Sequence, residues 1–285
     1  MRAERVTDRV CYHGEGPVWW ERWQQLRFVD MFAGDVLTLD GDLVTRASVG
    51  SPIAAAIRPR MGSGAIVARE RDLAISNFDD LSDLAGFVSL TDDPARRCND
   101  GGCDPDGGFW IGTLEYGFAP GTSVLHHLDA RSRRARTVLD GLTISNGIGW
   151  SPDSDTMYLN DSGTSTTWAF DYDPIEGLGN RRVFAKDSGA GVPDGLCVDV
   201  EGGVWIARYD GGCVQRFDAG GRLDGVVEVP GVSRITACCF GGRNLDALYL
   251  TTSRENLPED AEPAAGSVYR VSPGVAGLPA GGFAG

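Results

Sequence analysis

The sequence DGGFWIG at residues 106–112 and the sequence EGGVWIA at residues 201–207 carry one pattern. In each copy, a turn of acidic residues and glycine precedes a short apolar run that contains a tryptophan. Weaker copies occur at residues 25–30, 64–68, 155–160 and 246–251. The copies recur at intervals of roughly 40–50 residues, which is the length of one four-stranded propeller blade.

Composition supports an all-β chain built from this repeat. The 285 residues include 40 glycines, which suit a chain that must turn every few residues, and 42% hydrophobic residues, which are ample for a buried core. The runs between the turns are short and rich in β-branched and aromatic residues. Because six copies occupy nearly the whole chain, we expect a single domain over residues 1–285. That domain is a six-bladed β-propeller with four-stranded blades around a central channel.

Charge and cysteine content limit the possible partners and compartment. The formal net charge of −14 argues against nucleic acid, because the phosphates would be repelled. The seven cysteines form no CxxC or histidine-spaced motif, which favours buried free thiols in a reducing compartment. The first residues are charged, unlike a signal peptide, and no stretch approaches the roughly 18 apolar residues of a membrane span. We therefore expect a cytoplasmic protein without a membrane partner.

Turns that occupy equivalent places in the repeat carry the candidate chemistry. They lie at residues 15–17, 51–53, 99–101, 146–148, 194–196 and 235–237, and four of the six contain Glu, Asn or Asp next to glycine. Equivalent turns of a propeller converge at one mouth of its channel. The sequence therefore predicts that Glu15, Asn99, Asn146 and Asp194 face one another across a small space, although each alone would be read as an ordinary Asx turn or cap.

This set of side chains has the composition of a cation site. It contains two carboxylates and two amides and no Cys or His, and such oxygen ligands suit Ca²⁺, Mg²⁺ or Mn²⁺ rather than a metal that prefers thiolates. Two carboxylates at one narrow mouth repel each other unless a cation lies between them. The pattern thus indicates one divalent cation.

Five ordered motifs occur along the chain: EGPVW at residues 15–19, RCNDG at 97–101 with DPDG at 104–107 and WIGT at 110–113, SNG at 145–147 with WSPD at 150–153, PDGL at 193–196 with GVW at 203–205, and CCFGG at 238–242 with LYLTT at 248–252. Together these motifs resemble those of the SMP-30/gluconolactonase/LRE family of regucalcin-like sugar lactonases. Blade two, residues 51–77, matches this pattern poorly. The resemblance therefore covers blades one and three to six.

The resemblance implies a division of roles among the candidate residues. It implies a six-bladed propeller in which Glu15, Asn146 and Asp194 hold the divalent cation and Asp194 is also the general base. It further implies that Arg97 and Asn99 contact the substrate or the metal-bound water. The family often presents an acidic residue to the substrate after the strand that follows, and Glu115 is the nearest candidate in this chain.

The reaction that follows is hydrolysis of a sugar lactone, an aldono-1,4- or 1,5-lactone, to the aldonic acid. The expected cofactor is one divalent cation, Ca²⁺ first, with Mg²⁺, Mn²⁺, Zn²⁺ or Fe²⁺ as alternatives. The expected partner is the small lactone, bound by a monomer or small homo-oligomer. Two other classes stay open: a metal-dependent esterase, phosphotriesterase or ring-opening enzyme of specialised metabolism, and a calcium-binding propeller without catalysis. His13, two residues before Glu15, is interpreted as a surface residue at a strand end, and the alternative is a residue that supports the cation ligands from behind.

Overall fold

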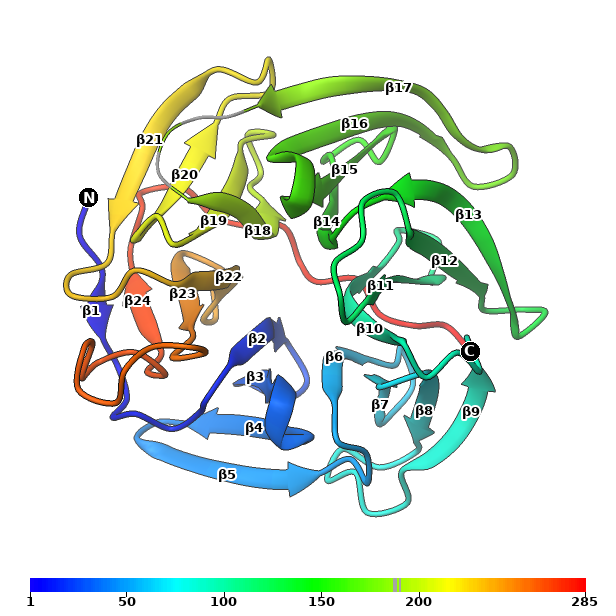
Figure 1. The fold of residues 1–285 in the computed structure, drawn as a ribbon, viewed down its shortest axis with the longest axis horizontal. Helices are drawn as coiled ribbons and strands as arrows, with labels where there is room; N and C mark the ends of the chain where they lie inside the picture. The colour runs from blue at the N-terminus through cyan, green and yellow to red at the C-terminus, as the bar shows by residue number, and fades with distance from the viewer. Residues whose placement is uncertain (187–188, 190) are drawn as a thin grey trace.

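The computed structural model describes residues 1–186, 189 and 191–285. In this part of the chain, six antiparallel sheets of four strands each stand as blades around a central axis (Figure 1). The only helical elements among these residues are two 3-10 helices of three residues each. The six-bladed β-propeller predicted from the repeat is therefore confirmed. Within the described residues, no helix is long and apolar enough to cross a membrane.

Each of the first five blades takes four consecutive strands, the first of which lies nearest the axis. Blade 1 consists of β2 (Gly14–Trp20), β3 (Gln25–Asp30), β4 (Asp35–Asp40) and β5 (Leu43–Ser48). Blade 2 consists of β6 (Ala54–Pro59), β7 (Ala65–Arg69), β8 (Asp72–Ser76) and β9 (Ala85–Ser89). Blade 3 consists of β10 (Arg96–Cys103), β11 (Phe109–Glu115), β12 (Ser123–Asp129) and β13 (Arg134–Leu142).

The later blades follow the same order. Blade 4 consists of β14 (Ser145–Trp150), β15 (Thr156–Asp161), β16 (Thr166–Asp173) and β17 (Gly177–Lys186), and blade 5 of β18 (Val192–Val198), β19 (Val204–Tyr209), β20 (Cys213–Phe217) and β21 (Leu223–Glu228). The 3-10 helices η1 (Met31–Ala33) and η2 (Ser162–Thr164) directly follow the second strands of blades 1 and 4. The copies of the sequence repeat are these second strands.

Blade 6 joins the two ends of the chain and closes the ring. It consists of β22 (Ile235–Gly241), β23 (Ala247–Thr252), β24 (Tyr269–Val271) and, as its outer strand, β1 (Glu4–Arg5). The sequence predicts closure by residues 6–10. The structure places the paired strand slightly earlier, and residues 6–10 continue along blade 6 with backbone hydrogen bonds from Val6 N to Val268 O and from Val10 N to Gly266 O. Closure removes exposed strand edges.

Aromatic residues of the second strands pack between neighbouring blades. Trp110 of blade 3 is buried edge-on against Trp150 of blade 4, with ring centroids 6.0 Å apart. Equivalent places against the next blade are taken by Tyr158, Trp205 and Tyr249. These rings fill the wedges between blades and are structural.

Every innermost strand contains a β-bulge near its start. The register shifts between Glu15 and Val18 in β2, and shifts of the same kind occur in the other five innermost strands. A bulge leaves residues unpaired and re-aims their side chains. The sequence pattern predicts turns at the six equivalent segments, and five of these predictions are wrong: those segments are the bulged beginnings of innermost strands, whereas residues 51–53 precede β6. The bulge of β6 carries alanines, so blade 2 adds no polar group there.

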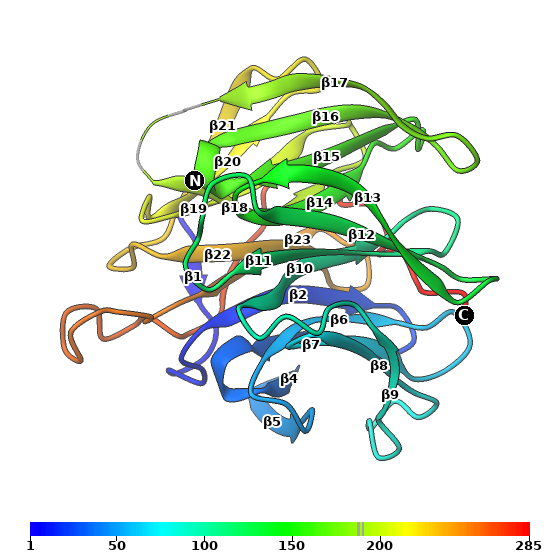
Figure 2. The ribbon, with the colours of Figure 1, turned by 45° about the vertical axis from the view of Figure 1, so that its right-hand side comes forward.

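The C-terminal tail, residues 272–285, crosses the far end of the ring from blade 6 to blades 2 and 3 (Figure 1). Leu278 N donates to Val198 O, Phe283 N donates to Pro59 O and Ala284 N donates to Gly107 O. These partners lie at or just beyond the ends of innermost strands, whereas the bulges lie at the starts. The tail and the bulges are therefore at opposite ends of the ring, and Figure 2 shows the C-terminus and the loop after β23 on opposite sides.

Phe283 fixes the end of this tail, because its side chain is completely buried in the core between blades 2 and 3. We expect Phe283→Ala to lower the free energy of unfolding by about 3–5 kcal/mol, since the change removes a buried ring and leaves a cavity. Urea denaturation measures this loss. Ile175→Ala, at a residue that is 88% exposed, is the control and should change the stability little. If Phe283→Ala lost no more stability than the control, the proposal that the Phe283 ring fixes the C-terminal tail to blades 2 and 3 would be contradicted.

Candidate functional site at one mouth of the ring

Four predicted residues gather at the bulged mouth. Glu15, Asn99, Asn146 and Asp194 are all buried at equivalent starts of innermost strands in blades 1, 3, 4 and 5. The last three are themselves unpaired bulge residues. Asn99 reaches across the blade boundary, where its Nδ2 donates to Ser145 O at 2.9 Å. The structure therefore brings together side chains that lie far apart in the sequence.

Glycines after two of these residues let the innermost strands approach closely. A Cβ on Gly147 would lie 2.6 Å from Asp194 O, and a Cβ on Gly195 would lie 2.4 Å from the Cβ of Ala237. Any side chain at either position would push blades 4, 5 and 6 apart at the mouth. The Asn-Gly and Asp-Gly pairs thus combine a polar ligand with the close packing that brings the ligands together.

A second layer of hydrogen bonds holds Asp194 and Asn146 in place. Asn160 Nδ2 donates to Asp194 O at 2.5 Å, and Ser162 Oγ donates to Pro193 O at 2.6 Å. Asn146 Nδ2 donates to Ser162 Oγ at 3.1 Å. The amide nitrogen of Asn146 is engaged there, and its carbonyl oxygen Oδ1 has no hydrogen-bond partner among the described residues.

Two oxygen atoms at this mouth fit a cation. Asn146 Oδ1 and Asp194 Oδ1 are buried and, among the described residues, accept no hydrogen bond. Buried acceptors without a donor are costly, and a bound cation would satisfy both. The described residues contain no cluster of three or more His, Cys, Asp or Glu side chains with metal-binding geometry. A site here would combine the Glu15 and Asp194 carboxylates with the Asn146 amide, and amide oxygens are ordinary ligands of hard cations.

The raised pKa values of the two buried carboxyl groups also favour a bound cation at this mouth. Burial, and next the charge of Asp100, raise the pKa of Glu15 from 4.5 to about 8. Burial, and next the charges of Glu15 and Asp100, raise the pKa of Asp194 well above its usual value. Each carboxylate is therefore destabilised as an anion by loss of water and by its neighbours. A positive charge between them would relieve both penalties.

Arg97 and Asn99 form a buried donor pair beside these carboxylates. Arg97 Nη1 donates to Asn99 Oδ1 at 2.7 Å and to Cys98 O at 2.9 Å. The guanidinium lies 5.6 Å from the Phe32 ring centroid and 5.9 Å from that of Tyr116. Burial lowers the pKa of Arg97. Arg97 is a fixed cationic group at the mouth, held by aromatic faces and backbone.

Glu115 is turned away from this group. It pairs across the ladder with Arg96, and its Oε1 lies 3.6 Å from Arg96 Nη2. Successive side chains of a strand point to opposite faces, so Glu115 shares a face with Arg96 and not with Arg97. The structure thus does not bring Glu115 to the other four residues, and its contact with substrate stays a prediction.

The sequence interpretation of His13 as a surface residue is wrong. His13 is only 6% exposed, and its Nδ1 lies 2.8 Å from Ser253 Oγ and 3.5 Å from Glu255 Oε2. Burial, and next the charge of Arg97, lower the pKa of His13 to about 3, so the ring is neutral at pH 7. The Phe32 ring of η1 packs against it with ring centroids 4.8 Å apart, and no local signal in the sequence indicates that packing.

Asp100 is a functional candidate that the sequence analysis missed. Its side chain is buried behind Glu15, and its Oδ1 accepts a hydrogen bond from Gly101 N at 2.7 Å and lies 3.7 Å from Arg58 Nη2. Burial raises its pKa, and Arg58 opposes that shift. Only its place in the Asn-Asp-Gly bulge, next to a predicted site residue, could have drawn attention to it.

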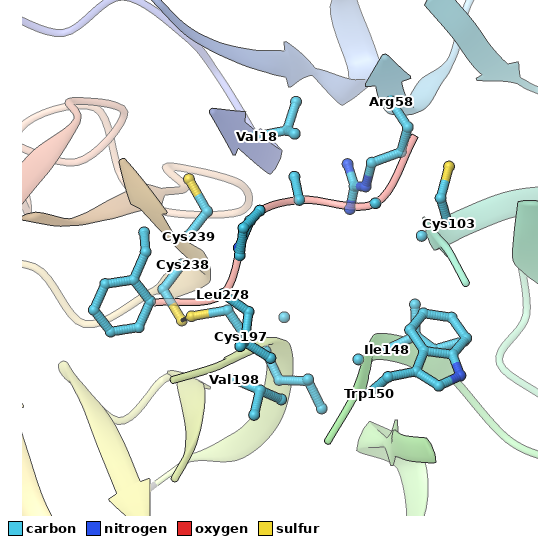
Figure 3. Close-up of a pocket in the computed structure, with 18 of the residues that line it drawn as sticks. Val18, Arg58, Cys103, Ile148, Trp150, Cys197, Val198, Cys238, Cys239 and Leu278 are labelled. Atoms are coloured by element: carbon cyan, nitrogen blue, oxygen red, sulfur yellow. Dashed lines mark hydrogen bonds between the residues drawn. The ribbon is translucent and has the colours of Figure 1, made fainter. Parts of the chain in front are cut away.

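A cavity of about 370 Å³ lies deeper along the axis, between this group and the tail. Figure 3 shows its wall, where Arg58 points inward and the sulfur atoms of Cys197 and Cys238 lie 3.6 Å apart. Asp100 lines it too, and Leu278 of the tail closes it on the far side. The cavity is thus behind the candidate site, and the polar side chains converge at the mouth.

These features define a class of protein: a six-bladed β-propeller with a buried, oxygen-rich polar centre at one mouth of the ring. Residues 13–254 match the sequence model described as the SMP-30/gluconolactonase/LRE-like region. The match spans well over half of the chain. The chain therefore belongs to the SMP-30/gluconolactonase/LRE family, as its motifs predict.

Individual relatives agree over nearly the full length. Regucalcin of Bos taurus is 33% identical over 98% of this chain and 97% of its own sequence. A calcium-binding protein, the regucalcin of Agrobacterium tumefaciens, has a similar structure with a TM-score of 0.92 and 26% identity over 99% of this chain and 97% of that one. A luciferin-regenerating enzyme is similar with a TM-score of 0.91 and 29% identity over 99% of both chains.

Proposed function

We propose that this protein is a metal-dependent lactonase that hydrolyses a sugar lactone, an aldono-1,4- or 1,5-lactone, to its aldonic acid. One observation carries the proposal. The buried Glu15 and Asp194 carboxylates and the bare Asn146 Oδ1 lie at the same mouth as the buried Arg97–Asn99 donor pair. A site built only to hold an ion needs no fixed guanidinium beside it, whereas a hydrolase needs both a charged centre and donors that orient a polar substrate.

Glu15, Asn146 and Asp194 would hold one divalent cation in this proposal. Their oxygens suit Ca²⁺ first, and Mg²⁺, Mn²⁺, Zn²⁺ and Fe²⁺ are the alternatives to be tested. When bound, such a cation supplies Lewis-acid polarisation of the lactone carbonyl. The family membership and the calcium binding stated for the relative from Agrobacterium tumefaciens support this assignment.

The protein's own residues supply positioning and proton transfer. Arg97 and Asn99 orient the lactone through donors that are fixed before the substrate arrives. Asp194 accepts a proton from the attacking water as the carbon–oxygen bond forms, and returns it to the ring oxygen as the ring ester bond breaks. The products are one carboxylic acid and one hydroxyl on the same open chain. No covalent enzyme intermediate is needed.

A panel assay tests this function. Purified protein stripped of metal is supplied with Ca²⁺, Mg²⁺, Mn²⁺, Zn²⁺ or Fe²⁺ and offered aldono-1,4- and 1,5-lactones, with acid release as the readout. We expect turnover above the uncatalysed rate only when a divalent cation is present. Hydrolysis of aryl esters or phosphotriesters instead would favour the other hydrolase class, and cation binding without any turnover would favour a calcium-binding propeller.

The proposal also covers partners and compartment. The lactone is the only partner that it requires, and it places the protein in the cytoplasm as a monomer or small homo-oligomer. The cysteines are free thiols in the structure, which supports a reducing compartment. The net charge of −14 supports the exclusion of nucleic acid and of anionic membrane surfaces.

A further inference from the structure

Glu255 brings a carboxylate to the same mouth from blade 6. It lies in the loop that follows β23, the loop that projects from the bulged face in Figure 2. Its backbone N donates to Ser253 Oγ at 2.9 Å, which fixes the loop. Its Oε2 accepts a hydrogen bond from Tyr209 Oη at 3.1 Å and lies 3.5 Å from His13 Nδ1. Glu255 is thus held by residues of blades 5 and 1.

The charge of Glu255 acts on two of the candidate site residues, Asp194 and Arg97. Its charge contributes to the raised pKa of Asp194, after burial and the charges of Glu15 and Asp100. Its charge also opposes the burial that lowers the pKa of Arg97. Glu255 therefore lies within electrostatic range of the candidate base and of the candidate substrate-binding guanidinium, on the blade 6 side of the mouth.

This carboxylate has acceptor capacity left for a ligand. The phenol of Tyr209 and the imidazole of His13, which is neutral at pH 7, both contact its Oε2. A carboxylate has about four lone-pair sites, so these two contacts do not use all of them. Its side chain is 26% exposed, so it can be reached from the mouth, unlike the fully enclosed carboxylates below it. Hydroxyl groups are the donors that match such an acceptor.

We propose that Glu255 accepts hydrogen bonds from ring hydroxyl groups of the lactone and so selects hydroxylated lactones over unsubstituted ones. This inference rests on the proposed lactonase function and adds a substrate-selecting residue to it. Arg97 and Asn99 hold the substrate from blade 3, and Glu255 holds it from blade 6 with its orientation set by Tyr209. In this proposal Glu255 is the acidic residue that contacts the substrate. The sequence analysis names Glu115 as the candidate for that contact, but the Glu115 carboxylate lies beside Arg96.

Two lactones with the same ring, one hydroxylated and one unsubstituted, provide the test. D-glucono-1,5-lactone and δ-valerolactone have the same ring, and only the first carries hydroxyls. At saturating Ca²⁺ we expect Glu255→Ala to lower kcat/KM for the hydroxylated lactone by roughly 10- to 100-fold, mainly through KM, because a hydrogen bond to a charged group is lost. The kcat/KM for δ-valerolactone should stay within about 3-fold of the wild type, since it makes no such bond.

Related variants sharpen the reading. Glu255→Gln keeps the shape and one acceptor and should lie between the wild type and Glu255→Ala, and Tyr209→Phe should shift the same ratio less. Glu201→Ala, at an exposed side chain that pairs with Arg216, is the matched control and should change neither rate. Calorimetric Ca²⁺ titration of each variant reports whether the site is intact, and we expect affinities close to that of the wild type.

The outcomes separate this inference from the proposed function. Equal losses for both lactones, or no loss for either, would overturn the role of Glu255 while leaving the lactonase assignment in place. A selective loss in Glu115→Gln together with unchanged Glu255 variants would move the role to Glu115. A wild-type protein that hydrolyses no aldono-1,4- or 1,5-lactone with any cation would overturn the function itself.

Discussion

Asp194→Ala is expected to lower kcat/KM for the lactone by ~10³-fold or more, because it removes a general base and a cation ligand together. Cation affinity should fall as well, since one of the two carboxylates of the proposed ligand set is lost. Turnover and calorimetric cation titration measure the two effects separately. A wild-type rate in Asp194→Ala would refute the assignment of the base.

Asp194→Asn separates the two roles of this residue. The amide keeps an oxygen that can contact the cation and keeps the shape of the side chain, but it cannot accept a proton from water. We therefore expect Asp194→Asn to bind the cation better than Asp194→Ala and to turn over almost as slowly. Asp171→Asn, at a side chain that is 60% exposed, is the control and should behave as the wild type.

Stability provides a third readout that a merely structural role would not produce. In the cation-free protein, Asp194 is a buried carboxylate close to the charges of Glu15 and Asp100, which raises its pKa. Its replacement by Asn removes that repulsion. The free energy of unfolding in chelator should therefore rise at pH 8, while activity is lost. A clear fall in the free energy of unfolding of Asp194→Asn would mean that the Asp194 carboxylate stabilises the fold, and that its burial beside other carboxylates is not a stability cost kept for function.

Much of this molecule can be predicted from its repeat. Equivalent positions of a propeller share one structural environment, so the register that places Asn146 at a mouth also places Asp194 and Asn99 there. The same register predicts that Trp110 and its equivalents pack between blades. What the repeat does not specify is whether a polar position lies in a turn or in a bulged strand, because both are local interruptions of the apolar pattern.

Other parts of the site lie outside the repeat and could not be predicted from it. Glu255 lies in the connection after β23, at residues 253–268, which is longer than the equivalent connection of every other blade, so no register places it. The direction of Glu115 depends on strand parity counted from the bulge in β10, which the sequence analysis did not locate. The burial of His13 depends on contacts with Ser253, some 240 residues away. These are tertiary facts without a local signal.

A second large effect is expected in the stability of the cation-free protein between pH 6.5 and 8. Glu15 has a pKa of about 8 in the folded protein, against an ordinary value of 4.5. The folded state then binds more protons than the unfolded state in this window, so the free energy of unfolding should fall as the pH rises. The expected fall is about 1–2 kcal/mol, since one bound proton corresponds to about 1.4 kcal/mol per pH unit.

Other titratable groups change the free energy of unfolding mainly outside the range from pH 6.5 to 8. The pKa of His13 is lowered from 6.5 to about 3 in the folded protein. Below pH 6.5 the unfolded chain therefore binds a proton at His13 that the folded protein does not, which lowers the free energy of unfolding. Above pH 6.5 the ring is neutral in both states. Its contribution rises with pH below 6.5 and is nearly constant above it. Carboxyl groups with lowered pKa, such as that of Asp104, lose their contribution only near pH 4 and below. Between pH 6.5 and 8, the raised pKa values of Glu15 and of the neighbouring buried Asp194 and Asp100 dominate the pH dependence of stability.

A divalent cation should reverse this trend. The cation binds the ionised carboxylates, so it competes with protons and its affinity should increase as the pH rises. Saturating Ca²⁺ should therefore raise the melting temperature more at pH 8 than at pH 6.5. Glu15→Gln should flatten the pH dependence of the cation-free protein and weaken the response to Ca²⁺. Urea denaturation and thermal melts in chelator and in Ca²⁺ measure both. A cation-free stability that rises with pH, or a Ca²⁺ effect of equal size at both pH values, would show that Glu15 is ionised without a cation and would remove the electrostatic reason for placing one there.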